Sequence, residues 1–152
     1  MSKVLKLKCV KCGREYNEAE ILYTCRDCGI DGILDVVLDY DSIRKELTHE
    51  YLKNNKDYSL WRYLPAIPLE KTGGIQPLQV GWTPLYNIKS LSKETGLGSF
   101  FLKDDSRNPT ASLKDRASAV GVAKAIELGR TVMCAASTGN AASSLSGFAA
   151  VA

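Results

Sequence analysis

Two copies of one cysteine pattern constrain this chain more than any other feature of its sequence. Each copy reads C-x-x-C-G, first as Cys9-Val10-Lys11-Cys12-Gly13 and then as Cys25-Arg26-Asp27-Cys28-Gly29. Each pair can present two thiolates to one face, and two such faces complete a tetrahedron around one metal ion. Each trailing glycine suits a tight turn in which backbone N–H groups approach sulfur. We therefore predict a four-thiolate metal site made by Cys9, Cys12, Cys25 and Cys28.

Four thiolates fill the coordination sphere, so the site is expected to be structural, with no open catalytic position. Zn²⁺ is the predicted ion. Iron with rubredoxin-like ligation is the alternative, because a four-thiolate tetrahedron also accepts iron. A redox dithiol would need only one C-x-x-C pair, and disulfides are disfavoured in a reducing compartment. The fifth cysteine, Cys134, lies in an apolar run and is expected to be a small buried side chain.

Composition places the chain among soluble globular proteins. Its 152 residues are 45% hydrophobic and 24% charged, with a formal net charge of +3, and this length allows about one ordinary domain. The basic excess is small and dispersed, which argues against nucleic-acid binding. No apolar run approaches the ~18 residues of a membrane span, and the N-terminus lacks the apolar core of a signal peptide. The expected location is the cytoplasm, with no membrane partner.

Three regions are predicted along the chain. Residues 1–40 form a zinc ribbon, with short strands at 4–8, 21–24 and 33–39. Residues 41–84 form a helix and an extended connector: Asp41 or Ser42 caps a charged helix that runs to about Asn54, and residues 57–84 hold all but one of the prolines. The sole histidine, His49, lies on this helix and is expected to be a surface residue without chemistry.

The third region, residues 85–152, alternates strand and helix in the order of a parallel α/β sheet. We predict a helix at 89–95, a strand at 99–103, a helix at 112–128 that stops at Gly129, a buried strand at 131–136 and a helix from Ala141. Ligands of such sheets bind beyond the carboxyl ends of the strands. The predicted packing face of the long helix consists largely of small residues: Ala117, Val120, Gly121, Lys124 and Leu128.

A lysine stands at the start of that long helix, in the run Asn108-Pro109-Thr110-Ala111-Ser112-Leu113-Lys114-Asp115-Arg116. Asn-Pro favours a turn, and Ser112 with Asp115 has capping-box spacing, in which Asp115 reaches back to Ser112. Lys114 then lies at the positive end of the helix dipole, where a cation is disfavoured. A lysine whose charged form is disfavoured is a better amine nucleophile. The alternative is a solvated lysine that happens to lie early in a helix.

A second polar turn, Ser137-Thr138-Gly139-Asn140, lies between the last predicted strand and the last predicted helix. The first N–H groups of a helix have no intrahelical partner and point outward along the positive end of the dipole. This turn is therefore a candidate anion site. An ordinary N-cap turn is the alternative, because Ser, Thr and Asn are common capping residues.

The lysine run resembles the cofactor-binding segment of the fold type II enzymes that use pyridoxal 5'-phosphate (PLP). Within that group it is most similar to the threonine synthases, whose usual form is N-P-T-G-S-F-K-D-R. Here Ala111 replaces the usual glycine and Leu113 the usual phenylalanine. We expect Ala111 to exclude a φ > 0 conformation that glycine would allow cheaply. The segments Trp61-Arg62-Tyr63-Leu64-Pro65 and Gly81-Trp82-Thr83-Pro84-Leu85 also resemble entry segments of this family.

The resemblance implies a fold and a site. The fold would be α/β, a small zinc ribbon with four cysteine ligands followed by part of a parallel-sheet, tryptophan synthase β-like PLP domain. Lys114 would bond PLP and move protons at the substrate, and Asn140 would hydrogen-bond the cofactor's 3'-oxygen. The substrate anion would be held by Ser137, Thr138, Asn140 and Ala141. The implied reaction converts O-phosphohomoserine and water into threonine and phosphate, in an enzyme that is a homodimer when full length.

The chain ends in an apolar stretch from Leu145 to Ala152 that has no C-cap and no closing glycine. We expect it to be the N-terminal part of a longer enzyme and inactive alone, since the family's glycine-rich phosphate loop is absent. Other fold type II enzymes remain alternatives: a threonine or serine dehydratase, a sulfur-transferring synthase or a cysteate-forming relative. A zinc-ribbon binding module on a degenerate enzyme domain is the alternative from a different class.

Overall fold

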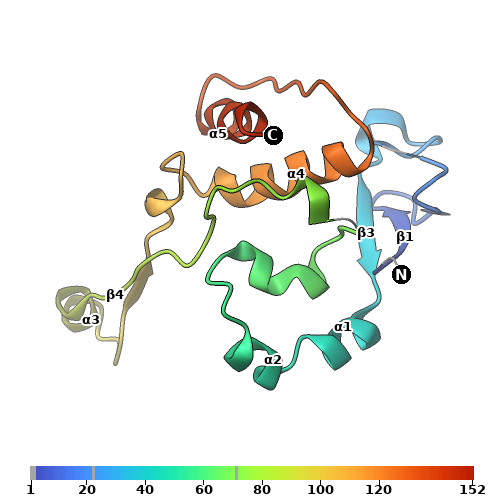
Figure 1. The fold of residues 1–152 in the computed structure, drawn as a ribbon. Coiled ribbons are helices and arrows are strands. Elements are labelled where there is room, and N and C mark those ends of the chain that lie inside the picture. Colours follow the sequence, from blue (N-terminus) through green and yellow to red (C-terminus); the bar gives the residue numbers. More distant parts are fainter. Residues whose placement is uncertain (1–2, 22, 71) are drawn as a thin grey trace. The chain divides into compact units, whose positions relative to one another are not determined.

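The structure is a computed structural model that describes residues 3–21, 23–70 and 72–152. The chain divides into two units. Unit 1 is Met1–Asn55 with Tyr63–Glu70, and unit 2 is Lys56–Arg62 with Lys71–Ala152. Figure 1 shows the elements of both units, and each unit is described by itself below.

Unit 1 begins with a three-stranded antiparallel sheet in the order β2-β1-β3. The strands are β1 (Val4–Cys9), β2 (Glu15–Tyr16) and β3 (Leu34–Leu38), and a short 3-10 helix, η1 (Gly29–Asp31), follows the second cysteine pair. The strands predicted at 4–8 and 33–39 are therefore confirmed. The strand predicted at 21–24 is wrong: it is reduced to a single bridge from Thr24 to Ile33, and residue 22 lies outside the described residues. The backbone on both sides of 21–24 forms turns instead, with the Glu20 N–H bonded to the Asn17 carbonyl and the Gly29 N–H bonded to the Cys25 carbonyl.

Two short helices follow the sheet in unit 1, where one longer helix was expected. Helix α1 (Tyr40–Glu46) is capped by Asp39, whose carboxylate accepts from the Ser42 N–H at 3.0 Å, and not by Asp41 or Ser42. Helix α2 (His49–Asn54) has its own cap, because the Thr48 hydroxyl accepts from the Tyr51 N–H at 3.1 Å. A threonine that caps a new helix cannot also continue the old one. His49 is exposed, as predicted.

The connector contains the 3-10 segments η2 (Leu60–Ala66, kinked at Tyr63) and η3 (Thr72–Gly74). In unit 2 it leads into a hairpin of β4 (Leu85–Asn87) and β5 (Phe101–Lys103), with α3 (Lys89–Thr95) at its far end (Figure 1). The predicted helix at 89–95 is confirmed, and β5 is a shorter form of the strand at 99–103. The pairing of β4 with β5 is antiparallel, and every strand pairing among the described residues is antiparallel. The parallel sheet thus stays a prediction.

Helices α4 (Lys114–Glu127) and α5 (Asn140–Ala150) pack against each other in unit 2, as Figure 1 shows. Their core contains Ala119, Val122 and Ala123 of α4 and Phe148 of α5. The packing face predicted for α4 is wrong, since Ala117, Gly121 and Leu128 are exposed and Val120 and Lys124 are only half-buried. The buried face is the one turned to α5 and η3, because within the described ranges this helix and this 3-10 turn, rather than a sheet, cover α4. Gly129 ends this helical segment at φ 68°, as predicted.

The strand predicted at 131–136 is also wrong. These residues are exposed and have no regular structure, and Cys134 is exposed rather than buried. A strand is stable only where a neighbouring strand takes up its N–H and C=O groups, and no described strand pairs with this segment. Across the described ranges, no helix is long and apolar enough to cross a membrane.

Candidate functional site

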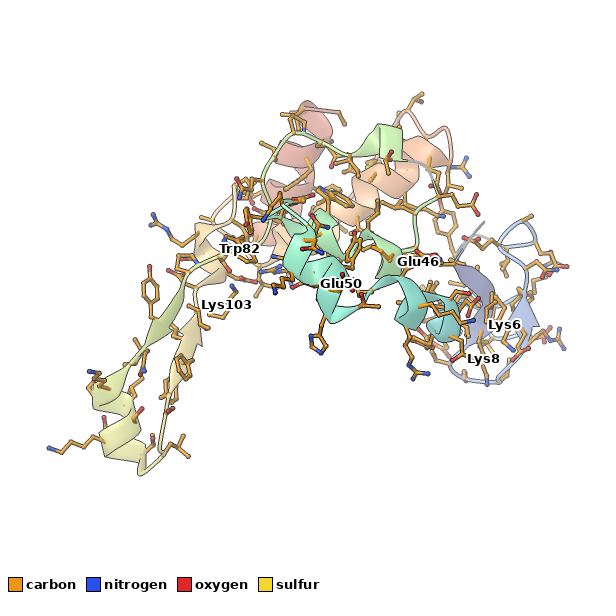
Figure 2. The ribbon with its side chains drawn as sticks, turned by 60° about the horizontal axis from the view of Figure 1, so that its bottom comes forward. Lys6, Lys8, Glu46, Glu50, Trp82 and Lys103 are labelled. Carbon is orange, nitrogen blue, oxygen red and sulfur yellow. The ribbon has the colours of Figure 1, made fainter. Side chains whose placement is uncertain are left out.

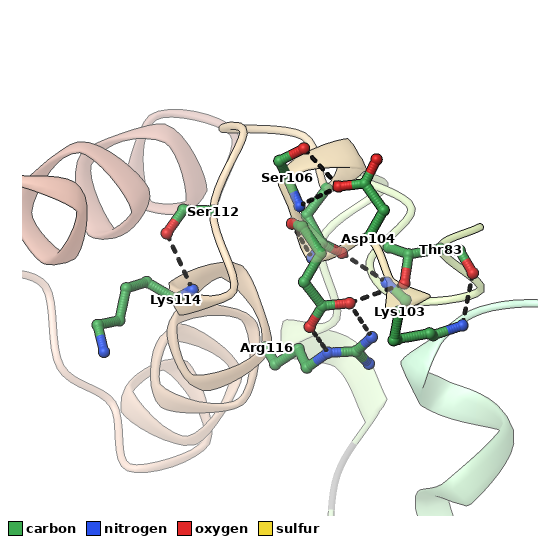
Figure 3. Close-up of polar contacts among 10 residues, drawn as sticks. Thr83, Lys103, Asp104, Ser106, Ser112, Lys114 and Arg116 are labelled. Carbon is green, nitrogen blue, oxygen red and sulfur yellow. Dashed lines mark hydrogen bonds and ion pairs between the residues drawn. The ribbon is translucent and has the colours of Figure 1, made fainter. Parts of the chain in front are cut away.

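Lys114 is the first residue of α4, where the sequence predicted it. The loop before it runs from η4 (Asp105–Arg107) to Leu113, and the Ser112 hydroxyl accepts a hydrogen bond from the Lys114 N–H at 3.1 Å. The lysine is exposed, and Figure 3 shows its side chain extending away from Arg116. None of the described residues forms an ion pair with its Nζ atom. The loop therefore presents an unengaged amine at a helix start.

The predicted capping box does not form, because the N-cap of α4 is Leu113 and no side chain caps the helix there. Asp115 does not reach back to Ser112; its carboxylate instead accepts from the Thr110 N–H at 2.7 Å and from the Thr110 hydroxyl. It also accepts from the Ser144 hydroxyl of α5 at 2.7 Å, and Ser144 lies 2.7 Å from the Ser118 hydroxyl. We call Thr110, Asp115, Ser118 and Ser144 the Asp115 cluster. Asp115 therefore binds Ser144 of α5 in place of the local partner, Ser112, that the sequence predicted.

The Asp115 cluster is buried at its centre, with Asp115 and Ser144 both at 0% exposure. A buried carboxylate is stable only where donors surround it, and here a backbone N–H and two hydroxyls fill that role. Asp115 also lies in the first turn of α4, where a negative charge is favourable. The cluster thereby fixes α5 against the loop that carries Lys114.

A second carboxylate, that of Asp105, also contacts the start of α4. Arg116 binds Asp105 with two parallel contacts, Nε to Oδ2 and Nη2 to Oδ1, each 2.8 Å long (Figure 3). The Thr83 hydroxyl donates to Asp105 Oδ1 at 2.7 Å. The Arg116 guanidinium, helped by Thr83, lowers the pKa of Asp105 to about 2. We call Thr83, Asp105 and Arg116 the Asp105 cluster; it joins the start of α4 to the segment before β4.

Asn108 connects the same loop to the turn at Gly81. Its side-chain oxygen accepts from the Gly81 N–H at 2.9 Å, and its amide nitrogen donates to the Asp105 carbonyl at 2.9 Å. Gly81 has φ 85°, and an added Cβ there would lie 3.1 Å from both Arg116 and Leu60. Only glycine fits this close approach without strain.

Sequence reasoning missed a cluster of an arginine and two aromatic rings beside this turn. The Arg62 guanidinium lies 4.7 Å from the centre of the Trp82 ring and 5.9 Å from that of Tyr58. The two rings are 4.8 Å apart, and Trp82 is labelled in Figure 2. Arginine over an aromatic face is attractive. The motifs W-R-Y-L-P and G-W-T-P-L contained two of these residues, but spacing alone gave no reason to bring them together.

The loop geometry corrects one expectation. Ala111 was expected to exclude positive φ, yet it has φ 57°, in the left-handed region. The Ala111 N–H donates to the Asn108 carbonyl at 2.9 Å, which closes the turn. Alanine therefore adopts the conformation that glycine would take more cheaply.

The second candidate loop lies at the start of α5. Asn140 is the first residue of that helix, one position earlier than predicted, and the Ser137 hydroxyl accepts from the Gly139 N–H at 3.2 Å. Ser137, Thr138, Asn140 and Ala141 are all exposed. No hydrogen bond joins them to Lys114 in the described part of the chain. Their connection to the lysine runs through Ser144, one helical turn beyond Asn140, and Asp115, the neighbour of Lys114.

In unit 1 the four predicted cysteines come together. The Sγ atoms of Cys9, Cys12, Cys25 and Cys28 all lie within 4.8 Å of one another. Cys12 and Cys25 Sγ are 3.7 Å apart, close to the ~3.8 Å edge of a tetrahedron built on Zn–S bonds of about 2.3 Å. Gly32 leaves room for them, because a Cβ there would lie 2.5 Å from the Cys25 Cβ. The donor set therefore fits a tetrahedral metal ion.

Electrostatics support the same conclusion. The hydrogen bond from Tyr16 lowers the pKa of the Cys25 thiol to about 6, whereas the hydrogen bond with Cys12, together with burial, raises the pKa of the Cys28 thiol to about 12. Four adjacent thiols therefore cannot all ionise by themselves. A cation among them removes the conflict, since metal ligands must be thiolates.

The surface of this ribbon carries paired charges of both signs. Lys6 and Lys8 project from β1 (Figure 2), and Lys6 forms an ion pair with Glu15 at 2.7 Å. Lys11 pairs with Asp31 at 2.9 Å. Basic side chains on this surface therefore have acidic partners.

The comparisons with known proteins agree with the motifs. Residues 77–152 match the family described as pyridoxal-phosphate dependent enzyme. The chain is similar to the threonine synthase of Methanocaldococcus jannaschii, with 41% identity over 143 residues, or 94% of this chain and 34% of that protein. It is also similar to the threonine synthase of Methanosarcina acetivorans, with 43% identity over 141 residues, or 91% and 33%. The chain thus spans about a third of these relatives' length. No solved structure matches it significantly.

Proposed function

The chain belongs to the pyridoxal-phosphate dependent enzyme family, and from this premise we propose that it is the N-terminal part of a threonine synthase. The whole enzyme would convert O-phosphohomoserine and water into threonine and phosphate. One observation carries the proposal: an exposed Lys114, held at the start of α4 by two hydrogen-bonded clusters, lies in a chain that is 41–43% identical to two threonine synthases over nearly its whole length.

Lys114 is the residue that bonds the cofactor in this proposal. Its exposure and its lack of an ion pair among the described residues support the role, because the amine is available. PLP, when bound, supplies an electron sink for the substrate's α carbon. Lys114 Nζ would also hold and move protons at the α and β carbons of the substrate.

Residues at the start of α5 hold the anionic partners. Asn140 would donate a hydrogen bond to the cofactor's 3'-oxygen. The substrate anion would be bound by the side chains and N–H groups of Ser137, Thr138, Asn140 and Ala141. The free N–H groups of a helix start favour anions. Because these dipoles are fixed before the reaction, they stabilise charge without reorganising.

The Asp115 and Asp105 clusters are positioning groups in this scheme. The first holds α5 to the lysine loop, and the second holds the start of α4 to the segment before β4. Small misplacements at a reacting centre are costly to rate. Neither carboxylate is proposed to touch the substrate.

The cysteine cluster is proposed to be a structural Zn²⁺ site at Cys9, Cys12, Cys25 and Cys28. Its four thiolates would leave no position for a substrate or a water. In the complete enzyme we propose that further strands complete a parallel sheet around the cofactor, and that two copies form a cytoplasmic dimer.

The test uses the complete gene product with added PLP and O-phosphohomoserine. We expect equal amounts of threonine and inorganic phosphate, measured by chromatography and by a phosphate assay. A Lys114→Ala variant should lose turnover and keep its bound metal, whereas Lys93→Ala, an exposed lysine on α3, should behave as wild type. Normal turnover in Lys114→Ala would refute the assignment. Product without phosphate release, from serine or threonine, would favour a dehydratase.

A further inference from the structure

A tyrosine lies inside the cysteine cluster of unit 1. Tyr16 is only 6% exposed and forms one buried group with Cys9 and Cys25. It comes from β2, just after the first cysteine pair, yet its hydroxyl lies 3.1 Å from Sγ of Cys25 in the second pair. A buried hydroxyl is stable only with partners, and here one partner is a proposed metal ligand.

The direction of this contact follows from counting protons. The backbone N–H of Arg26 donates to the Tyr16 hydroxyl oxygen at 3.2 Å. An N–H group can only donate, so that contact uses a lone pair of the oxygen and leaves the hydroxyl proton available. Cys25 Sγ, once it is a metal-bound thiolate, can only accept. The hydroxyl proton must therefore point at Cys25 Sγ.

The hydrogen-bond donor to Cys25 Sγ is thus a side-chain hydroxyl, and in this Cys25 differs from Cys9, the other fully buried cysteine of the cluster. Cys9 Sγ accepts instead from the backbone N–H of Cys12 at 3.5 Å, an ordinary length for a hydrogen bond to sulfur, and not from a side-chain hydroxyl. Four thiolates around a divalent ion carry a net charge of −2, which is unfavourable away from water. A short side-chain hydrogen bond to a thiolate disperses part of that charge and fixes the orientation of the ligand.

We propose that Tyr16 is a positioning residue of the metal site, which holds the Cys25 thiolate by an O–H···S hydrogen bond and thereby raises metal affinity and tunes the metal–sulfur bond. This inference rests on the proposed four-cysteine site. Tyr16 lies outside both C-x-x-C-G segments, so these patterns alone do not predict this role.

The test titrates the reduced, metal-free full chain with Co²⁺, whose absorption reports tetrahedral thiolate ligation. Tyr16→Phe keeps the buried ring and removes only the hydroxyl. Tyr23→Phe is the matched control, because Tyr23 lies in the same ribbon and is 78% exposed. We expect Tyr16→Phe to weaken Co²⁺ binding by about 10- to 100-fold. Its sulfur-to-cobalt charge-transfer band should move to lower energy, since the sulfur lone pair is no longer stabilised.

The outcomes separate this inference from the site on which it rests. A wild-type chain without a tetrahedral Co²⁺ spectrum would refute the metal site, and the inference with it. A wild-type spectrum that is unchanged in Tyr16→Phe, with the same affinity, would refute the inference alone. If Tyr16→Phe and Tyr23→Phe lose affinity equally and keep the wild-type band position, the hydroxyl acts on the fold of the ribbon and the proposal also fails.

Discussion

Replacing Ser144 by alanine tests whether α5 is held to the lysine loop through Asp115. Ser144 is fully buried, and its hydroxyl donates to Asp115 Oδ1 at 2.7 Å. A hydrogen bond to a charged group contributes about 1.5–3 kcal/mol, and alanine recovers about 0.5 kcal/mol through its higher helix propensity. The expected net loss is therefore about 1–2.5 kcal/mol in the free energy of local opening.

Hydrogen exchange followed by mass spectrometry measures this loss directly, because amide exchange reports the free energy of local opening. Peptides that cover α5 and the loop at 108–113 should exchange about 5- to 60-fold faster in Ser144→Ala. Ser146→Ala is the matched control, since Ser146 is exposed on the same helix. Equal exchange rates in the two variants would show that the Asp115 cluster does not hold α5.

Two further predictions concern the loop itself. Ala111→Gly should raise the free energy of unfolding of unit 2 by up to about 1 kcal/mol, because glycine adopts the φ of 57° without strain; urea titration followed by tryptophan fluorescence measures this, and destabilisation would contradict it. The second prediction concerns Asp105, whose pKa is lowered from 3.8 to about 2 in the folded chain. Its ionised carboxylate therefore stabilises unit 2 by about 1–2 kcal/mol at pH values above about 4, and this contribution should disappear as the pH falls from about 4 through 2. In Asp105→Asn the same acid titration should lack this component, and an identical pH dependence would contradict the reasoning.

The clustering of the four cysteines and the place of Lys114 at a helix start could be predicted from the sequence because their information is local. A C-x-x-C-G pattern fixes two sulfurs and a turn within a few residues, so only the meeting of the two pairs depended on the fold. Lys114 likewise lies six positions after Asn108, and its N–H donates to the hydroxyl of Ser112. Helices 89–95 and 112–128 were found for the same reason.

The errors arose where distant residues decided the outcome. Asp115 fits the local spacing of a capping box, but a buried serine 29 residues away is a better partner. The apolar run at 131–136 indicated burial, yet a strand also needs a neighbour, which sequence composition does not supply. The face of α4 was misassigned because small residues line both of its sides, and only the position of α5 decides between them.

Tyr16 and Arg62 show a second limit of sequence reasoning. Neither belongs to a recognisable spacing, because each acts across the fold: Tyr16 on a cysteine nine positions later, and Arg62 on Trp82. Their roles depend on side-chain geometry that only the three-dimensional structure contains.

The central claim is that Lys114 is the lysine that bonds PLP. The most direct test is to add PLP to the complete gene product, reduce it with borohydride, digest it and locate the phosphopyridoxyl group by mass spectrometry. We predict that the label lies on the peptide that contains Lys114 and is lost in Lys114→Arg. A label on another lysine, or no label in a folded protein with its metal bound, would contradict the account.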